Sequence, residues 1–218
     1  WLTARNTLGY NFVFIISGTV FSIIVALLLY EIKEKALIKY LQTTMLLPHF
    51  MSWVVIAFIA YGFLNTSSGV LNGMLTSLGL DRINWYTSKR AWVFIIPMAH
   101  LWKGIGMHAL LYYATLVGVD PSYYEAAKIE GASRFNMAIY ITLPFLYPLV
   151  TMLTILAVGR VFDADFGLFY QLPMDSPMLR DTTEVIDTYV YRALRQLGNI
   201  GMSTAVDLYK SVIGMALV

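Results

Sequence analysis

The sequence contains no cysteine and few charged residues, and each shortage excludes a class of function. Without cysteine the chain forms no disulfide framework, no thiolate metal site and no thiol nucleophile. Charged residues make up 13% of the 218 residues, whereas soluble domains carry about a quarter. The formal net charge of +2 comes from scattered residues, so nothing indicates nucleic-acid binding. No glycine is followed by lysine, so the phosphate-cradling loop of an ATPase is absent and the chain cannot hydrolyse ATP alone.

Apolar residues, by contrast, are in excess. They make up 58% of the chain, the mean hydropathy is +0.65, and a soluble protein of this composition would expose large apolar patches. Because backbone polar groups in lipid must bond within their own segment, long apolar runs should be helices. The first run alone would cover roughly 34 Å at about 1.5 Å per residue, enough to cross a bilayer. The runs are 8–30, 41–64, 91–117, 145–168 and 205–218.

We therefore predict an all-α, polytopic membrane helical bundle with four complete spans and one truncated span. Residues 1–218 form a single transmembrane domain that is expected to be a piece of a longer polypeptide, incomplete at both ends. Pro48 should kink the second span, because proline removes a backbone donor. The connecting loops are expected at 65–90, 119–144 and 169–203, the first of them with a short surface helix.

The loop 119–144 has a regular pattern of helix signals. Asp120 is a good N-cap and Pro121 occupies the favoured first helical position, so a short helix should run to about Glu130. Gly131 then lets the chain leave helical geometry.

The exposed face of this short helix suits a partner protein. Ala126 and Ala127 are small enough to let another surface approach the backbone, and Glu125 can fix the orientation by pairing with a cation. The same segment resembles the cytoplasmic coupling loop of binding-protein-dependent ABC importer permeases. The pattern of that family is EAA, three residues, Gly, nine residues and I-x-L-P, and the matching residues here are Glu125, Ala126, Ala127, Gly131, Ile141, Leu143 and Pro144.

Three further segments resemble the carbohydrate branch of this family: 47–55, 102–106 and 185–192. They are most similar to permeases for polysaccharide fragments such as alginate, rhamnogalacturonide or aldouronate oligosaccharides. The resemblance implies a maltose-permease-like, type I ABC importer fold in the bacterial inner (cytoplasmic) membrane, with loops 65–90 and 169–203 extracytoplasmic. It also implies a second permease, two ATP-binding subunits that use ATP and Mg, and a solute-binding protein; this chain itself binds no cofactor and no metal.

The distribution of charged residues alone predicts the opposite orientation of the chain in the membrane. Five Lys and Arg residues lie in the loops on the side of 119–144, and seven lie in the loops on the other side. The positive-inside tendency would therefore place loop 119–144 outside. The resemblance places it in the cytoplasm, against the ATPase, and we follow the resemblance.

Lys103 is the single charge in the third run, and a lysine at a helix centre costs roughly 2.5–3.5 kcal/mol on insertion scales. It should therefore face a cavity or a partner. With His100 and His108 it forms one helix face that could line a translocation path and bond sugar hydroxyls or a uronate carboxylate. The alternative is that Lys103 pairs with a buried carboxylate, Asp163 or Asp165.

Other intramembrane polar residues also allow two interpretations. His49 and Trp53 are candidates for substrate contact, but a histidine after Pro48 also suits a hydrogen bond to kinked backbone. Arg160 and Asp163 have the spacing of an ion pair on one helix. The outer segments 70–80 and 182–197 would face the binding protein or anchor the chain at the membrane surface.

The predicted function is the permease subunit of an ATP-driven importer for a sugar or oligosaccharide. Within the same family, the alternative cargo is an amino acid, peptide or anion. A secondary transporter or channel, and a membrane scaffold without transport, are the rival classes. Neither rival class explains the presence of the segment around Glu125.

Overall fold

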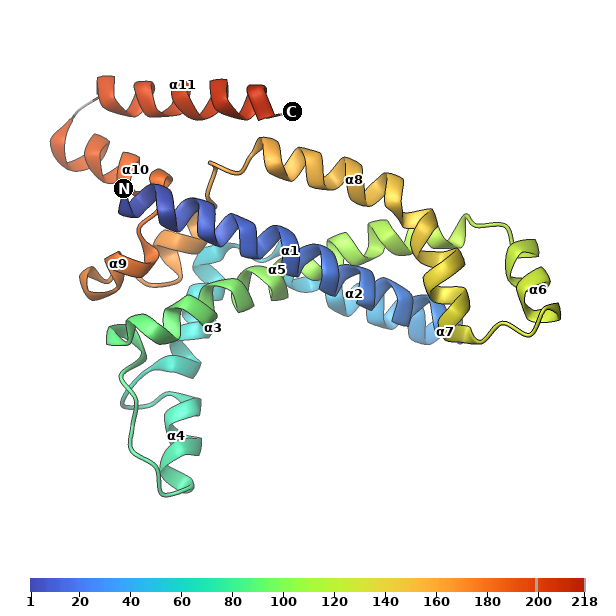
Figure 1. Ribbon diagram of the computed structural model, residues 1–218. Coiled ribbons are helices and arrows are strands. Elements are labelled where there is room, and N and C mark those ends of the chain that lie inside the picture. Colours follow the sequence, from blue (N-terminus) through green and yellow to red (C-terminus); the bar gives the residue numbers. More distant parts are fainter. Residues whose placement is uncertain (199, 218) are drawn as a thin grey trace. The chain divides into compact units, whose positions relative to one another are not determined.

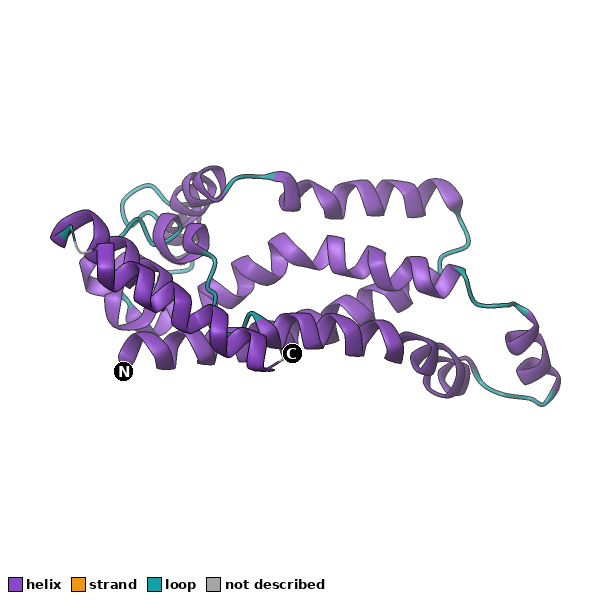
Figure 2. Ribbon diagram, turned by 90° about the horizontal axis from the view of Figure 1, so that it is seen from above, coloured by secondary structure: helices purple, strands orange, loops and turns teal. Residues whose placement is uncertain are grey.

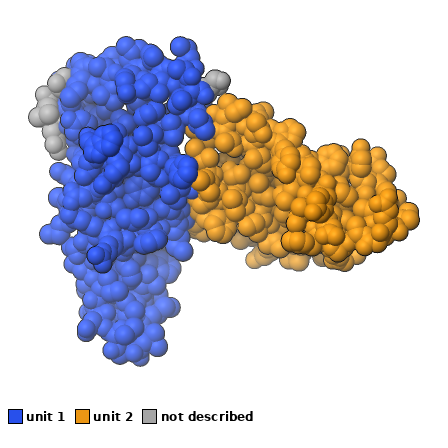
Figure 3. Space-filling view, viewed as in Figure 1, with its two compact units in different colours: residues 1–14, 51–100, 158–218 blue, residues 15–50, 101–157 orange. Residues whose placement is uncertain are grey.

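The computed structural model describes residues 1–198 and 200–217, and every regular element in that part of the chain is helical (Figures 1 and 2). The chain divides into two compact units (Figure 3). Unit 1 comprises residues 1–14, 51–100 and 158–218, and unit 2 comprises 15–50 and 101–157. The predicted all-α class is confirmed.

Three helical stretches are long and apolar enough to cross a membrane. They are α1 (Leu2–Glu31), α5 (Lys89–Val117) and the stretch Arg134–Gly159. A fourth span results if the bent pair α2 (Lys35–Phe50) and α3 (Trp53–Leu64) is counted as one. The expected four spans agree with this upper count. The C-terminal helix α11 (Ile200–Leu217) is not among these candidates, so the truncated fifth span stays a prediction.

The second span is interrupted rather than kinked. Pro48 lies inside α2, which continues to Phe50, and the break comes at Met51 and Ser52. There the Ser52 hydroxyl oxygen accepts a hydrogen bond from the backbone N–H of Val55 at 3.3 Å, which caps the new helix α3. The sequence placed the disturbance at the proline, whereas the cap three to four residues later ends one helix and starts the next.

The limits of the fourth span also differ from the prediction of 145–168. The helix already begins at α7 (Arg134–Met137), passes through one π turn at Ala138–Thr142 and continues as α8 to Gly159. Pro144 lies near the start of α8. The wider π turn directly before α8 relieves the clash that a proline makes with the preceding helical turn, so the helix continues. Beyond Gly159 the chain leaves the helix, so the carboxylates at 163 and 165 lie in a loop.

Shorter helices connect these spans. On one loop lie α4 (Val70–Ser77) and a 3₁₀ turn at Trp85–Thr87, and on another lies α6 (Ser122–Ile129). The segment after α8 contains a π turn at Gly167–Gln171, a 3₁₀ turn at Pro177–Leu179, α9 (Arg180–Thr183) and α10 (Ile186–Leu197). The predicted short helix in loop 65–90 is confirmed.

Each unit has its own apolar core. In unit 1 the core includes Phe169, Trp92 and Ile96, and in unit 2 it includes Tyr112, Leu116 and Leu146. Many large apolar side chains on α1, α3, α5 and α8 remain exposed in the isolated chain, as expected of surfaces that face lipid or partner subunits.

Candidate functional site

The short surface helix α6 begins as its sequence predicts. The Asp120 carboxylate accepts a hydrogen bond from the backbone N–H of Ser122 at 2.9 Å. This bond stabilises the ionised form and lowers the pKa of Asp120, so the cap stays charged at neutral pH. The helix then runs over Ser122–Ile129, within a residue of the predicted limits.

The end of α6 depends on Gly131. Its φ of +78° lies in the left-handed region, where a side chain is strained. The turn is closed by a hydrogen bond from the N–H of Ala132 to the carbonyl of Ala127 at 2.9 Å. Two residues later the Ser133 hydroxyl caps α7 by accepting from the N–H of Asn136 at 3.2 Å.

Side chains tie α6 to the membrane helices within unit 2. The Tyr124 and Thr142 hydroxyls are 3.2 Å apart, and Thr142 is buried in the π turn, where it also donates to the carbonyl of Met137 at 3.3 Å. The rings of Tyr124 and Tyr30 are 6.0 Å apart, so α6 also contacts the end of α1. These contacts link α6 to α1 and to the start of the fourth span.

Arg134 adds a second tie between this segment and α1, because its guanidinium pairs with Glu31 at 3.3 Å. Ile141 and Leu143 lie on the inner side of the same stretch; both are half-buried, and Leu143 packs against the core of unit 2. Pro144 is exposed.

The outer face of the segment is open. Glu125 and Ala126 are exposed, Ala127 is half-buried, and within the part of the chain that the structure describes the Glu125 carboxylate forms no hydrogen bond or ion pair. Beside them, Ile129 is 88% exposed and Phe135 71% exposed. One carboxylate, small residues and apolar side chains on one short segment are features of a protein-docking surface.

Within unit 2, Lys103 forms hydrogen bonds to the backbone at the end of α2. Its ammonium group donates to the carbonyl of His49 at 2.8 Å and to that of Pro48 at 3.4 Å. These two carbonyls lie at the C-terminal end of α2. The last four carbonyls of a helix have no hydrogen-bond partner within the helix, and the helix dipole is negative at this end. A close approach of α5 to α2 permits this contact: a Cβ on Gly106 would lie 2.0 Å from the Met45 carbonyl oxygen.

The alternative pairing of Lys103 with Asp163 or Asp165 stays a prediction, and each of these carboxylates has a partner within unit 1. Asp163 pairs with Lys210, and Asp165 accepts a hydrogen bond from the Trp53 indole N–H at 2.6 Å. Sequence spacing does not reveal that Lys103 bonds the carbonyls at the end of α2. For His49, the backbone carbonyl rather than the imidazole accepts the bond from Lys103.

We expect Lys103→Met to destabilise the protein by about 1–3 kcal/mol, because backbone acceptors in a membrane-spanning segment would lose their donor where water does not replace it. Lys103→Arg, which keeps the donors, should lose less than half as much. Thermal unfolding of the purified protein in detergent measures both variants. A methionine variant as stable as the wild type would show that Lys103 does not support the end of α2.

Trp53 and His100 have structural partners in unit 1. The Trp53 ring packs against Gly167, where an added Cβ would lie 2.3 Å from the ring. Asp165 accepts from Trp53 and also from the N–H of Gly167 at 3.0 Å. The His100 ring stacks on Phe14, with centroids 3.9 Å apart and an interplanar angle of 6°. His108, the remaining predicted path residue, is on α5 in unit 2.

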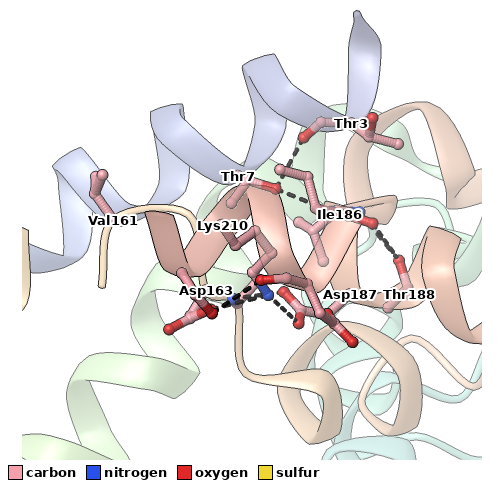
Figure 4. Close-up of polar contacts among 12 residues, drawn as sticks. Thr3, Thr7, Val161, Asp163, Ile186, Asp187, Thr188 and Lys210 are labelled. Atoms are coloured by element: carbon pink, nitrogen blue, oxygen red, sulfur yellow. Dashed lines mark hydrogen bonds and ion pairs between the residues drawn. The ribbon is translucent and has the colours of Figure 1, made fainter. Parts of the chain in front are cut away.

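Figure 4 shows a cluster that the sequence analysis missed. The Lys210 side chain is 8% exposed, and its ammonium group lies 2.7 Å from Asp187 and 2.9 Å from Asp163. The other oxygen of Asp187 accepts from the N–H of Ala164 at 2.7 Å, and Asn11 donates to the carbonyls of residues 161 and 163. The cluster joins α1, α10 and α11 to the loop after α8.

Asp163 therefore does not pair with Arg160, and that prediction is wrong. The two residues share a backbone hydrogen bond, in which the N–H of Asp163 donates to the carbonyl of Arg160 at 2.9 Å. One signal could have revealed the true partner: Lys210 is a lone charge in the last apolar run, as Lys103 is in the third. In the described residues no three His, Cys, Asp or Glu side chains come together as a metal site.

Comparison with known proteins assigns the chain to a family. Residues 11–169 match the model of the binding-protein-dependent transport system inner membrane component. The chain belongs to this permease family. It is 33% identical over 196 residues to the polygalacturonan/rhamnogalacturonan transport system permease protein YteP of Bacillus subtilis, which covers 90% of this chain and 60% of that protein.

Two further relatives of this permease agree. Protein LplB of Bacillus subtilis is 33% identical over 214 residues, which cover 98% of this chain and 67% of that one. A chain in the crystal structure of a bacterial alginate ABC transporter, in complex with its alginate pentasaccharide-bound periplasmic protein, superposes with a TM-score of 0.93 at 31% identity. That match covers 99% of this chain and 74% of the other, so the permease fold extends over the whole described chain.

Proposed function

We propose that this chain is a transmembrane subunit of an ATP-driven importer in the bacterial inner membrane, and that it carries a sugar or oligosaccharide. Membership of the permease family supports the importer, and the polysaccharides handled by the sequence and structural relatives support the cargo. The single observation that carries the proposal is the segment 120–144, with a capped helix, an open outer face and side-chain ties to two membrane helices.

In this proposal the chain works with a second permease, two ATP-binding subunits and an extracytoplasmic solute-binding protein. The ATP-binding subunits hold ATP and Mg and supply the energy. This chain contributes the docking surface around Glu125, Ala126 and Ile129, and loop 119–144 lies in the cytoplasm. Loops 65–90 and 169–203 then lie outside.

Coupling follows from the contacts of α6. When the ATP-binding subunits close, they displace α6, and the ties of Tyr124 to Thr142 and of Arg134 to Glu31 pass that displacement to α1 and the fourth span. Such transmission needs a rigid element with two arrangements. The cap at Asp120 and the turn at Gly131 make α6 such an element.

Reconstitution into proteoliposomes with the partner permease and ATP-binding subunits tests this proposal. We expect uptake of an oligosaccharide that requires both ATP and the solute-binding protein. Uptake driven by an ion gradient without ATP would instead support a secondary transporter. ATP-dependent uptake of an amino acid, a peptide or an anion but of no sugar would retain the importer and refute the cargo.

A further inference from the structure

A hollow of about 380 Å³ lies in unit 1, at the end of α3 and the loop that follows it. Two tyrosines, Tyr61 and Tyr86, line it together with Arg82 and Asn84. The remaining wall is polar and consists of residues 65–67. The volume is near the lower limit of small-molecule pockets, which span roughly 300–1,000 Å³.

The hollow is held in shape by Asn72, which is 1% exposed. Its amide donates to the carbonyls of Asn65 at 3.2 Å and Ile83 at 2.9 Å, and its oxygen accepts from the N–H of Ile83 at 2.9 Å. Asn65 in turn orders the turn beyond it, because its side-chain oxygen accepts from the N–H of Ser67 at 2.9 Å. The two walls are therefore fixed before any ligand arrives.

The lining of the hollow offers an exposed guanidinium and aromatic rings. Among the described residues, Arg82 forms no ion pair, and the buried Tyr86 hydroxyl has no hydrogen-bond partner. The Tyr86 hydroxyl is buried, so Tyr86 lines the hollow with its ring rather than with its hydroxyl. The rings of Tyr61 and Tyr86 are 5.8 Å apart and tilted by 54°, which leaves aromatic surface beside the polar groups.

This combination matches a sugar that carries a carboxylate. A guanidinium binds a carboxylate in bidentate fashion, amides and hydroxyls bond ring hydroxyls, and aromatic faces pack on the apolar face of a pyranose. An acidic side chain of a protein would meet Arg82 but would leave the hollow largely unfilled. We propose that this hollow is an extracytoplasmic binding site for one or two units of a uronic-acid oligosaccharide, with Arg82 on the carboxylate and the rings of Tyr61 and Tyr86 against the sugar ring.

This inference rests on the proposed function, because it places loop 65–90 outside the membrane and assumes an oligosaccharide cargo. The test uses the complete transporter in detergent, without its binding protein, and measures sugar binding by equilibrium dialysis. The probes are galacturonate and alginate trisaccharides and the carboxyl-reduced, neutral form of each.

We expect at least one acidic trisaccharide to bind the wild type, and Arg82→Gln to weaken that binding about tenfold or more while changing binding of the neutral form less than twofold. Tyr61→Ala, which removes an exposed ring from the hollow, should weaken both forms. Arg90→Gln, a nearby exposed arginine outside the hollow, is the matched control and should change neither.

The site assignment is overturned if neither acidic probe binds the wild type, or if Arg82→Gln and Arg90→Gln behave alike. It is also overturned if Arg82→Gln leaves sugar binding intact but weakens docking of the binding protein, because the hollow then serves a protein contact. The proposed function fails on a different measurement, namely when the wild type shows no ATP-dependent uptake of any oligosaccharide.

Discussion

Transport is expected to fall at least 30-fold when Glu125 is replaced by lysine, while insertion and folding stay normal. Reversal of a charge in a docked, charge-complementary contact costs roughly 2–5 kcal/mol, and each 1.4 kcal/mol is a factor of ten. Folding should not suffer, because Glu125 is exposed and forms no bond within the described chain. Substrate uptake and binding-protein-stimulated ATPase activity of the reconstituted complex measure the effect.

Glu34→Lys is the matched control, since Glu34 is an exposed acid in the connector between α1 and α2. It should transport at a rate close to that of the wild type. Full stimulated ATPase activity in the Glu125→Lys complex would remove Glu125 from the docking surface and refute its role in coupling.

Gly131→Asp should have a similar effect on transport for a different reason. A side chain at φ +78° costs about 1–2 kcal/mol, and a negative charge just after α6 opposes the negative end of the helix dipole. The turn that positions α6 is then disturbed while the membrane helices are untouched. Normal insertion with lost coupling is the expected result.

The second large effect is expected at Lys210. Lys210→Met leaves two carboxylates, Asp163 and Asp187, without their cation, and breaking a buried ion pair in this way costs about 3–5 kcal/mol. We expect the lower end of this range, because the Asp163 side chain is still 58% exposed. Thermal unfolding in detergent measures the loss.

Two comparisons make this test specific. The triple variant K210M/D163N/D187N removes all three charges and should recover most of the lost stability. Lys89→Met removes the cation of an exposed pair with Asp181 and should cost less than about 1 kcal/mol. If Lys210→Met is no less stable than Lys89→Met, the cluster does not hold unit 1 together.

Local signals in the sequence predicted local structure well. The cap at Asp120, the helix after it and the turn at Gly131 each depend on residues within a few positions, and all three are present in the structure. The spans were also found, because about 20 consecutive apolar residues suffice to indicate one. Their ends were harder to predict, since a π turn allowed the fourth span to begin before Pro144.

Partners of the buried charges could not be predicted, because they depend on helix packing. The Lys103 ammonium reaches carbonyls more than 50 positions earlier in the chain, where the two helices approach closely at Gly106. Lys210 meets Asp163 from another helix in the same way. Sequence spacing favoured Arg160 for Asp163 because neighbours on one helix are the pairs that periodicity can detect.

The location of α6 tests the account most directly. Since the chain has no cysteine, Ala126→Cys introduces a single thiol on the exposed face of α6. The account predicts that a membrane-impermeant maleimide labels it in inside-out vesicles but not in intact cells, and that a short crosslinker joins it to the ATP-binding subunit. Labelling from the outer side, or no crosslink in the assembled complex, would contradict the account.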